Sequence, residues 1–184
     1  MSAPARTKGG KSGNGAVRAA VPGRQHAATA PRWLQRATLA LSLGGLGVSL
    51  YLTIAHYTTA ATLACPETGV INCAKVTTSP QSVVFGIFPL AVLGLAFYLF
   101  MTAVNAPWAW RADWPVLRWA RLGSLIAGIG FVLYLIYTEL FTLDAICLWC
   151  TGIHVITFLL FALIVPTAAA RPEAGRSPAG RRAP

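Results

Sequence analysis

The sequence predicts an all-α integral membrane protein, a bundle of four transmembrane helices with an extracytoplasmic loop between the first two. Hydrophobic residues make up 55% of the 184 residues and charged residues only 11%, which is too apolar for a soluble globular domain. Four segments contain the roughly 20 apolar residues that cross a bilayer. They lack the alternation of a membrane barrel, and backbone groups in lipid must be hydrogen-bonded internally, so we predict helices.

We place the four spans at residues 37–57, 83–104, 119–141 and 147–166. In the second span, Gly86 is expected to allow a neighbouring helix to approach closely. Pro89 is expected to kink the same helix and open room beside the last span.

Two basic segments flank a single membrane domain at residues 32–170. Residues 1–31 and 171–184 are rich in Ala, Gly, Pro, Arg and Ser and show no apolar periodicity. We therefore predict disordered tails. They lack the interleaved aromatic side chains that are typical of nucleic-acid binding, so we expect no nucleic-acid partner.

The net charge of +10 is distributed as membrane topology requires. Of the 15 Lys and Arg residues, seven lie in residues 1–36, three lie in residues 111–121 and four lie in the C-terminal tail. Only Lys75 lies between the first two spans. The positive-inside rule then predicts cytoplasmic termini, with the 58–82 loop and the 142–146 turn on the other side of the membrane.

All four cysteines fall on this predicted extracytoplasmic side. Cys65 and Cys73 enclose the loop CPETGVINC, and Cys147 and Cys150 open the last span as CLWC. Disulfides form and persist on that side of a membrane. The distribution therefore indicates thiol chemistry.

The spacing of Cys147 and Cys150 favours a redox dithiol over two inert helix residues that pack as small hydrophobes. Residues three apart share a helix face, with Cα atoms about 5–6 Å apart, within the range that a disulfide tolerates. Asp144 is the expected N-cap, which would place Cys147 in the first helical turn. The helix N-terminus would there stabilise a thiolate.

The Cys65–Cys73 pair suggests a relay. Pro66 and Gly69 let the intervening loop turn back on itself, and thiol–disulfide exchange could then carry two electrons from a soluble partner to the membrane dithiol. Two alternatives stay open. One is a non-catalytic four-helix membrane protein with two structural disulfides, and the other is a metal site made of all four cysteines, although the loop spacing is wide for one.

A membrane dithiol needs a two-electron acceptor, and a quinone is the natural lipid-soluble one. His154 lies four residues after Cys150 on the same helix face, where it could bond a quinone carbonyl or, alternatively, a neighbouring helix. Ser82 and Phe85 are expected at a similar depth in the second span. The candidate quinone-binding residues are therefore Cys150, His154, Ser82 and Phe85, with Trp149 as a further stacking candidate.

The chain resembles a bacterial homologue of vitamin K epoxide reductase. The resemblance rests on CPETGVINC, the following AKVTTSPQSVVFGIFPLAVLGLAFYL, and CLWC at the start of the last span, and it covers residues 37–166. It implies a four-helix bundle around a quinone in the bacterial inner membrane. It also implies that disulfides are generated de novo at the CxxC and passed to a thioredoxin-fold partner of the DsbA type.

The resemblance implies a role for each cysteine. Cys150 would react with the quinone, Cys147 would form the exchange disulfide with the loop, Cys73 would attack it, and Cys65 would exchange with the partner. The chain leaves no room for the fused thioredoxin-like domain of some members, so we expect the partner to be a separate protein.

Two positions depart from the vertebrate members of that family. His154 stands where those members have a tyrosine, and Ser82 aligns with their asparagine before the Phe-Gly pair. Both departures favour simple quinone reduction over reduction of vitamin K epoxide. The Ala-, Gly- and Arg-rich tails are typical of a GC-rich bacterium, for which menaquinone is the expected quinone.

Overall fold

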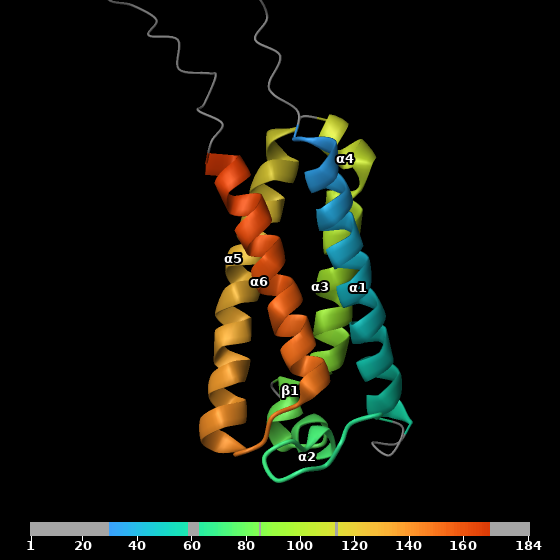
Figure 1. The fold of residues 1–184 in the computed structure, drawn as a ribbon, viewed down its shortest axis with the longest axis vertical. Helices are drawn as coiled ribbons and strands as arrows, with labels where there is room; N and C mark the ends of the chain where they lie inside the picture. Colours follow the sequence, from blue (N-terminus) through green and yellow to red (C-terminus); the bar gives the residue numbers. More distant parts are fainter. Residues whose placement is uncertain (1–29, 59–62, 85, 113, 170–184) are drawn as a thin grey trace, which may run out of the picture.

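Four long helices run side by side along one axis (Figure 1) in the computed structural model, which describes residues 30–58, 63–84, 86–112 and 114–169. They are α1 (Arg32–Tyr57), α3 (Leu90–Asn105), α5 (Pro115–Tyr137) and α6 (Leu148–Ala169). Helix α1 packs against α3 and α6, and α5 packs against the same two helices. The four helices therefore form a closed ring. Both predicted tails lie almost wholly outside the described residues.

Short elements lie at the two ends of this bundle. Helix α4 (Pro107–Arg111) lies at the end where α1 begins and α6 ends (Figure 1). Helix α2 (Cys73–Thr77) and the strand β1 (Val83–Val84) lie at the opposite end. All four cysteines of the chain belong to segments at or next to that second end.

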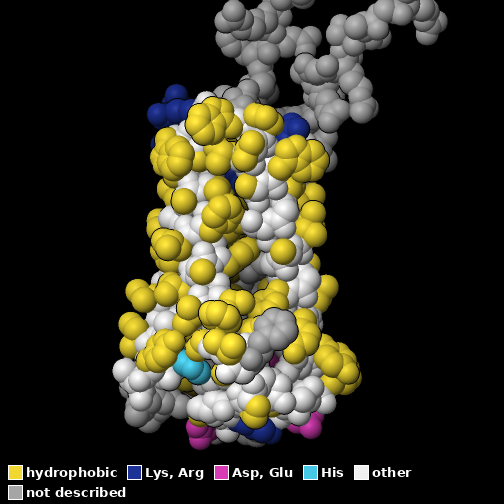
Figure 2. All heavy atoms as spheres, turned by 180° about the vertical axis from the view of Figure 1, so that it is seen from behind, with side chains coloured by type: hydrophobic (Ala, Val, Ile, Leu, Met, Phe, Trp, Pro, Cys, Tyr) yellow, Lys and Arg dark blue, Asp and Glu magenta, His cyan; other side chains and the backbone are white. Residues whose placement is uncertain are grey.

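The surface of the bundle fits a membrane protein. Among the described residues, three helices are long and apolar enough to cross a membrane: α1, α5 with its continuation to Thr142, and α6. Helix α3 is equally apolar but has only 16 residues. Figure 2 shows hydrophobic side chains along the whole length of one face, with Lys and Arg gathered mainly at one end and Asp and Glu at the other.

The second helix does not begin at residue 83, as predicted for the second span. The structure has a short antiparallel hairpin there, in which β1 pairs with β2 (Phe88–Pro89), and α3 begins only at Leu90. Gly86 occupies the turn with φ +68°, a conformation that other residues rarely adopt. Gly86 therefore closes a hairpin instead of letting two helices approach each other.

Pro89 marks the beginning of α3, and the predicted kink is also wrong. It is the N-cap residue with φ −61° and ψ 133°. A proline has no backbone N–H to donate and tolerates this position well, whereas inside a helix it would break a hydrogen bond. Of the apolar run 83–104, residues 83–84 and 86–89 are not helical, and that this run crosses the membrane stays a prediction.

The core is built on a face of α1 that carries small and polar residues. The buried side chains of α1 follow a helical spacing and include Thr38, Ser42, Gly45 and Ser49. Small residues let membrane helices approach closely. The hydroxyls of Thr38 and Ser42 bond back to the helix backbone, as Ser42 does to the Thr38 carbonyl at 2.8 Å.

Tyr98 of α3 fills the space that this face leaves. Its ring lies directly over Gly45, where an added Cβ would overlap it. Its hydroxyl bonds to the Thr157 hydroxyl of α6 at 2.8 Å and to the Ile153 carbonyl at 3.0 Å. One side chain therefore connects α1, α3 and α6 at the centre of the bundle.

This contact predicts that Gly45→Ala destabilises the bundle by about 1–3 kcal/mol, because the new methyl group would displace the Tyr98 ring. The measurement is the thermal unfolding midpoint in detergent. Gly44→Ala is the matched control, because nothing lies within 4 Å of a Cβ at that position. Its midpoint should stay unchanged or rise, since alanine favours a helix over glycine. Equal effects of the two substitutions would contradict this account of the core.

Candidate functional site

The two loop cysteines are joined in a disulfide. Cys65 and Cys73 are bonded with their Cα atoms 6.1 Å apart. Cys73 is fully buried and begins α2, whose N-cap Asn72 accepts a hydrogen bond from the Lys75 backbone N–H at 2.7 Å. Cys65 is only half-buried. The loop pair therefore has one sheltered sulfur and one accessible from outside the bundle.

Cys147 and Cys150 are free thiols whose sulfur atoms lie 2.7 Å apart. Cys147 is fully buried and directly precedes α6. Its sulfur accepts a hydrogen bond from the Cys150 backbone N–H at 3.3 Å, and its carbonyl accepts the first helical bond, from the Thr151 N–H at 2.9 Å. Cys147 itself therefore caps the helix.

The predicted N-cap, Asp144, is wrong. Asp144 is exposed and adopts a positive φ of 45° in the turn before the helix, three residues short of the cap. The prediction placed Cys147 in the first helical turn, where the helix N-terminus would stabilise a thiolate. The same stabilisation is available at the cap position, because Cys147 lies next to the helix N-terminus there. The hydrogen bond that the Cys150 thiol donates to it lowers the pKa of the Cys147 thiol below its ordinary value.

Backbone pairing brings the two cysteine pairs together. Ile71 and Ile146 form a parallel bridge, in which the Asn72 N–H donates to the Ile146 carbonyl at 3.1 Å and the Ile146 N–H donates to the Val70 carbonyl at 2.9 Å. Asn72 directly precedes Cys73, and Ile146 directly precedes Cys147. The pairing therefore fixes the loop disulfide beside the CxxC.

An aromatic clamp holds the other end of the loop, next to Cys65. The Trp149 indole N–H donates to the Ala64 carbonyl at 3.1 Å, and the Tyr51 hydroxyl accepts from the Ala64 N–H at 2.9 Å. The two rings also contact each other, with centroids 4.9 Å apart. Trp149 does not line the cavity described next, so its expected role as a quinone-stacking residue is not supported.

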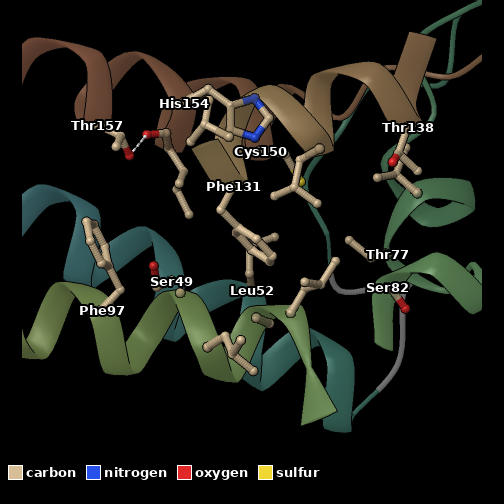
Figure 3. Close-up of a pocket in the computed structure, with 18 of the residues that line it drawn as sticks. Ser49, Leu52, Thr77, Ser82, Phe97, Phe131, Thr138, Cys150, His154 and Thr157 are labelled. Carbon is tan, nitrogen blue, oxygen red and sulfur yellow. Dashed lines mark hydrogen bonds between the residues drawn. The ribbon is translucent and has the colours of Figure 1, made fainter. Parts of the chain in front are cut away.

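A cavity of about 450 Å³ lies between the helices, within the usual size range of small-molecule sites. Cys150 lines it, whereas Cys147 does not. Figure 3 shows Cys150 and His154 of α6 facing Ser49 and Leu52 of α1 across this space. Of the other predicted residues, Ser82 lines the cavity and Phe85 lies outside the described residues.

The wall of the cavity is mainly apolar but carries polar groups that no protein atom satisfies. His154 is 4% exposed, one helical turn deeper than Cys150. The Ser49 hydroxyl and the Gln81 amide oxygen are buried and have no hydrogen-bond partner among the described residues. Buried polar groups are almost always paired, so these two fit a polar ligand inside an apolar pocket. The chemistry of this lining is compatible with a quinone, which has an apolar ring and two carbonyl oxygens.

Sequence reasoning missed Ser49, Gln81 and Glu139 among the lining residues. Ser49 and Gln81 gave no signal, because a serine in a membrane helix or a glutamine in a loop is ordinary. Glu139 did give one, because an acidic residue within an apolar span is costly and commonly functional. The structure buries Glu139 in η3 (Thr138–Thr142), a π-helical turn that follows α5.

The four-cysteine metal alternative finds no support in this arrangement. The Cys65–Cys73 disulfide occupies two of the sulfurs that such a site would need as ligands. Within the part of the chain that the structure describes, no three His, Cys, Asp or Glu side chains are arranged to hold a metal ion.

Fold and site together define a helical membrane protein with a loop disulfide held beside a buried dithiol. Residues 36–165 match the model of the vitamin K epoxide reductase family. The chain belongs to the vitamin K epoxide reductase family, which indicates an oxidoreductase. None of the curated proteins compared with the sequence matches it.

The aromatic clamp predicts that Trp149→Phe loosens the loop around Cys65. The substitution removes the indole hydrogen bond to Ala64, which contributes about 1 kcal/mol. Hydrogen–deuterium exchange of the peptide that contains Ala64 and Cys65 should become about fivefold faster. Trp114→Phe is the matched control, because Trp114 is 68% exposed and precedes α5 at the opposite end of the bundle. Unchanged protection in the Trp149 variant would show that the clamp does not hold the loop.

Proposed function

We propose that this protein is a quinone-dependent thiol oxidoreductase that generates disulfides de novo. Electrons pass from a thioredoxin-fold partner to the Cys65/Cys73 pair, then to the Cys147/Cys150 pair, and finally to a membrane quinone. The single observation that carries this proposal is the placement of Cys150. Its thiol lies 2.7 Å from Cys147 on one side, and on the other it lines the cavity that carries the polar groups of Ser49 and Gln81.

The cysteines act in two exchange steps. The partner's dithiol reduces the Cys65–Cys73 disulfide through Cys65, which is the more accessible sulfur of the pair. Cys73 then attacks Cys147 of the oxidised CxxC, which breaks the Cys147–Cys150 bond, forms a Cys73–Cys147 disulfide and leaves Cys150 as a thiol. Cys65 attacks Cys73 of that disulfide, which re-forms the loop disulfide and releases Cys147 as a thiol. The backbone bridge between Ile71 and Ile146 supports this transfer, because it keeps Cys73 and Cys147 on adjacent segments.

The cavity is the proposed quinone site. A bound quinone accepts two electrons and two protons from the dithiol. The Ser49 hydroxyl and the His154 ring are placed to bind its carbonyl oxygens, while Leu52, Phe97 and Phe131 supply apolar walls. Cys150 supplies the sulfur that faces the ligand. Menaquinone is the expected quinone, on the composition of the tails alone.

We place the protein in the bacterial inner membrane with four spans. Helix α3 is short for a bilayer, and we infer that the β1–β2 hairpin before it completes the second span. Both termini would be cytoplasmic. The Arg residues around α4 support this orientation, because they lie at the end of the bundle opposite the cysteines.

The proposed partner is a separate thioredoxin-fold protein of the DsbA type, outside the cytoplasm. Its dithiol would meet Cys65 in a loop segment of largely exposed residues, 64–70. Lipid and quinone are the other expected partners, and no role in nucleic-acid binding is proposed.

The test is quinol formation by the detergent-purified protein, mixed with a reduced DsbA-type protein and a short-chain quinone. Cys150→Ala should abolish turnover, because no sulfur would then face the cavity. Cys65→Ala should block turnover with the protein partner, while a small dithiol that reaches the CxxC directly still supports it. A Cys150→Ala variant that turns over normally would refute the assignment of the quinone-facing sulfur. Disulfides that resist a mild reductant in an inactive wild type would favour the structural alternative.

A further inference from the structure

A buried carboxyl group lies beside the dithiol. Glu139 is 6% exposed and lines the same cavity as Cys150. It belongs to the span that runs from Pro115 to Thr142. An acidic side chain in such a position is costly unless it has a function or a partner, and no Lys or Arg lines this cavity among the described residues.

The backbone directs Glu139 toward the CxxC. The π-helical turn Thr138–Thr142 inserts it between the end of α5 and the loop to α6, and such turns recur at functional sites. The Glu139 carbonyl accepts a hydrogen bond from the Ala145 N–H at 3.1 Å. The loop therefore folds back over this turn, and the Cys147 backbone N–H donates to the Glu139 carboxylate.

The Glu139 carboxylate lies near the two thiols of the dithiol. It is close enough to interact electrostatically with Cys147 and with Cys150. The other titratable groups that face the same cavity are His154 of α6, His56 of α1 and Tyr98 of α3. Among these groups, only Glu139 interacts with both cysteines and also lines the cavity.

We propose that Glu139 is the proton-transfer residue of the Cys147/Cys150 dithiol. This inference rests on the proposed function above. When the dithiol is oxidised, the two S–H bonds break and one S–S bond forms, and two electrons leave for the quinone. Glu139 takes up the proton of one thiol and passes it to a quinone oxygen, while Cys150, which lines the cavity, gives the other thiol proton to the quinone directly, so that both protons end on the quinol.

A purely structural role does not require a carboxyl group. The hydrogen bond from the Cys147 N–H could be accepted equally well by the amide oxygen of a glutamine, without a buried negative charge. A negative charge next to two thiols also opposes thiolate formation. A carboxyl group at position 139 therefore has an electrostatic cost that a glutamine would not have. A role as proton acceptor explains why a carboxyl group is present, whereas a purely structural role does not.

Glu139→Gln separates the two roles, because it should change two measurements in opposite directions. Quinol formation should slow by about 100-fold, the usual loss when a general acid–base group is removed. Alkylation of Cys147 and Cys150 by iodoacetamide at about pH 8, where carboxyl groups are ionised, should become at least about threefold faster without the neighbouring charge. The alkylation needs neither quinone nor partner protein.

Asp144→Asn is the matched control, because it removes the same charge from an exposed carboxyl group three residues before Cys147. It should leave both rates within about twofold of the wild type, as expected for a screened surface charge. Glu139→Asp, which keeps a carboxyl group, should retain more quinol formation than Glu139→Gln. If Glu139→Asp retains more quinol formation, a fold defect common to both substitutions cannot explain the loss in Glu139→Gln.

The outcomes distinguish this inference from the proposed function. A wild-type protein that forms quinol, together with a Glu139→Gln variant that forms it at the same rate, would overturn the role of Glu139 and leave the function intact. Slower alkylation in the glutamine variant would overturn it as well. A wild-type protein that forms no quinol would overturn the proposed function, and with it the proton transfer, even if the alkylation rates still showed the contact between Glu139 and the dithiol.

Discussion

Two backbone hydrogen bonds to Ile146 hold the loop between α1 and α2 against the start of α6. The Asn72 N–H donates to the Ile146 carbonyl, and the Ile146 N–H donates to the Val70 carbonyl. Together these bonds form the parallel bridge between Ile71 and Ile146. Without them, the loop disulfide and the CxxC would belong to separate segments joined only through the bundle. With them, the segment that leads into Cys73 lies beside the segment that leads into Cys147.

The rest of the site depends on this arrangement. Cys147 caps the helix, is fully buried and directly follows the residue that pairs with the loop, while Cys150 lines the cavity. Tyr98 and the small-residue face of α1 hold the helices around that cavity at a fixed separation. Glu139 enters from the π-helical turn between α5 and α6. The loop side and the cavity side of the dithiol are therefore assembled from different elements that meet at the Cys147/Cys150 pair.

Much of the fold could be predicted from the sequence, because long apolar runs and the sorting of Lys and Arg reflect the membrane directly. The stretch 83–89 could not, since an apolar run without clear periodicity does not distinguish a hairpin from a helix. Glycine and proline are common in turns and at helix starts, as Gly86 and Pro89 are in the structure. The prediction instead followed the apolar composition of the segment and placed both residues inside a helix. The fold prediction therefore failed where local backbone preference competes with apolar composition.

The candidate site shows the same limit. Cys65, Cys73, Cys147 and Cys150 could be identified because their spacing and membrane side are sequence properties, and His154 and Ser82 line the cavity as expected. The helix cap was misplaced, because a positive φ at Asp144 depends on the path of the whole turn. The contact of Trp149 with Ala64 depends on tertiary packing across 85 residues, which no local pattern encodes.

The most direct test of this account is to detect the disulfide between Cys73 and Cys147. In a protein that carries Cys65→Ser and Cys150→Ser, only these two sulfurs remain, and mild oxidation followed by mass spectrometry of the digested chain would show whether they join. The account predicts a Cys73–Cys147 disulfide in most molecules, and much less cross-linking of Cys65 to Cys147 when Cys73→Ser and Cys150→Ser are combined. Free thiols at both positions in the first variant, with ready cross-linking in the second, would contradict it.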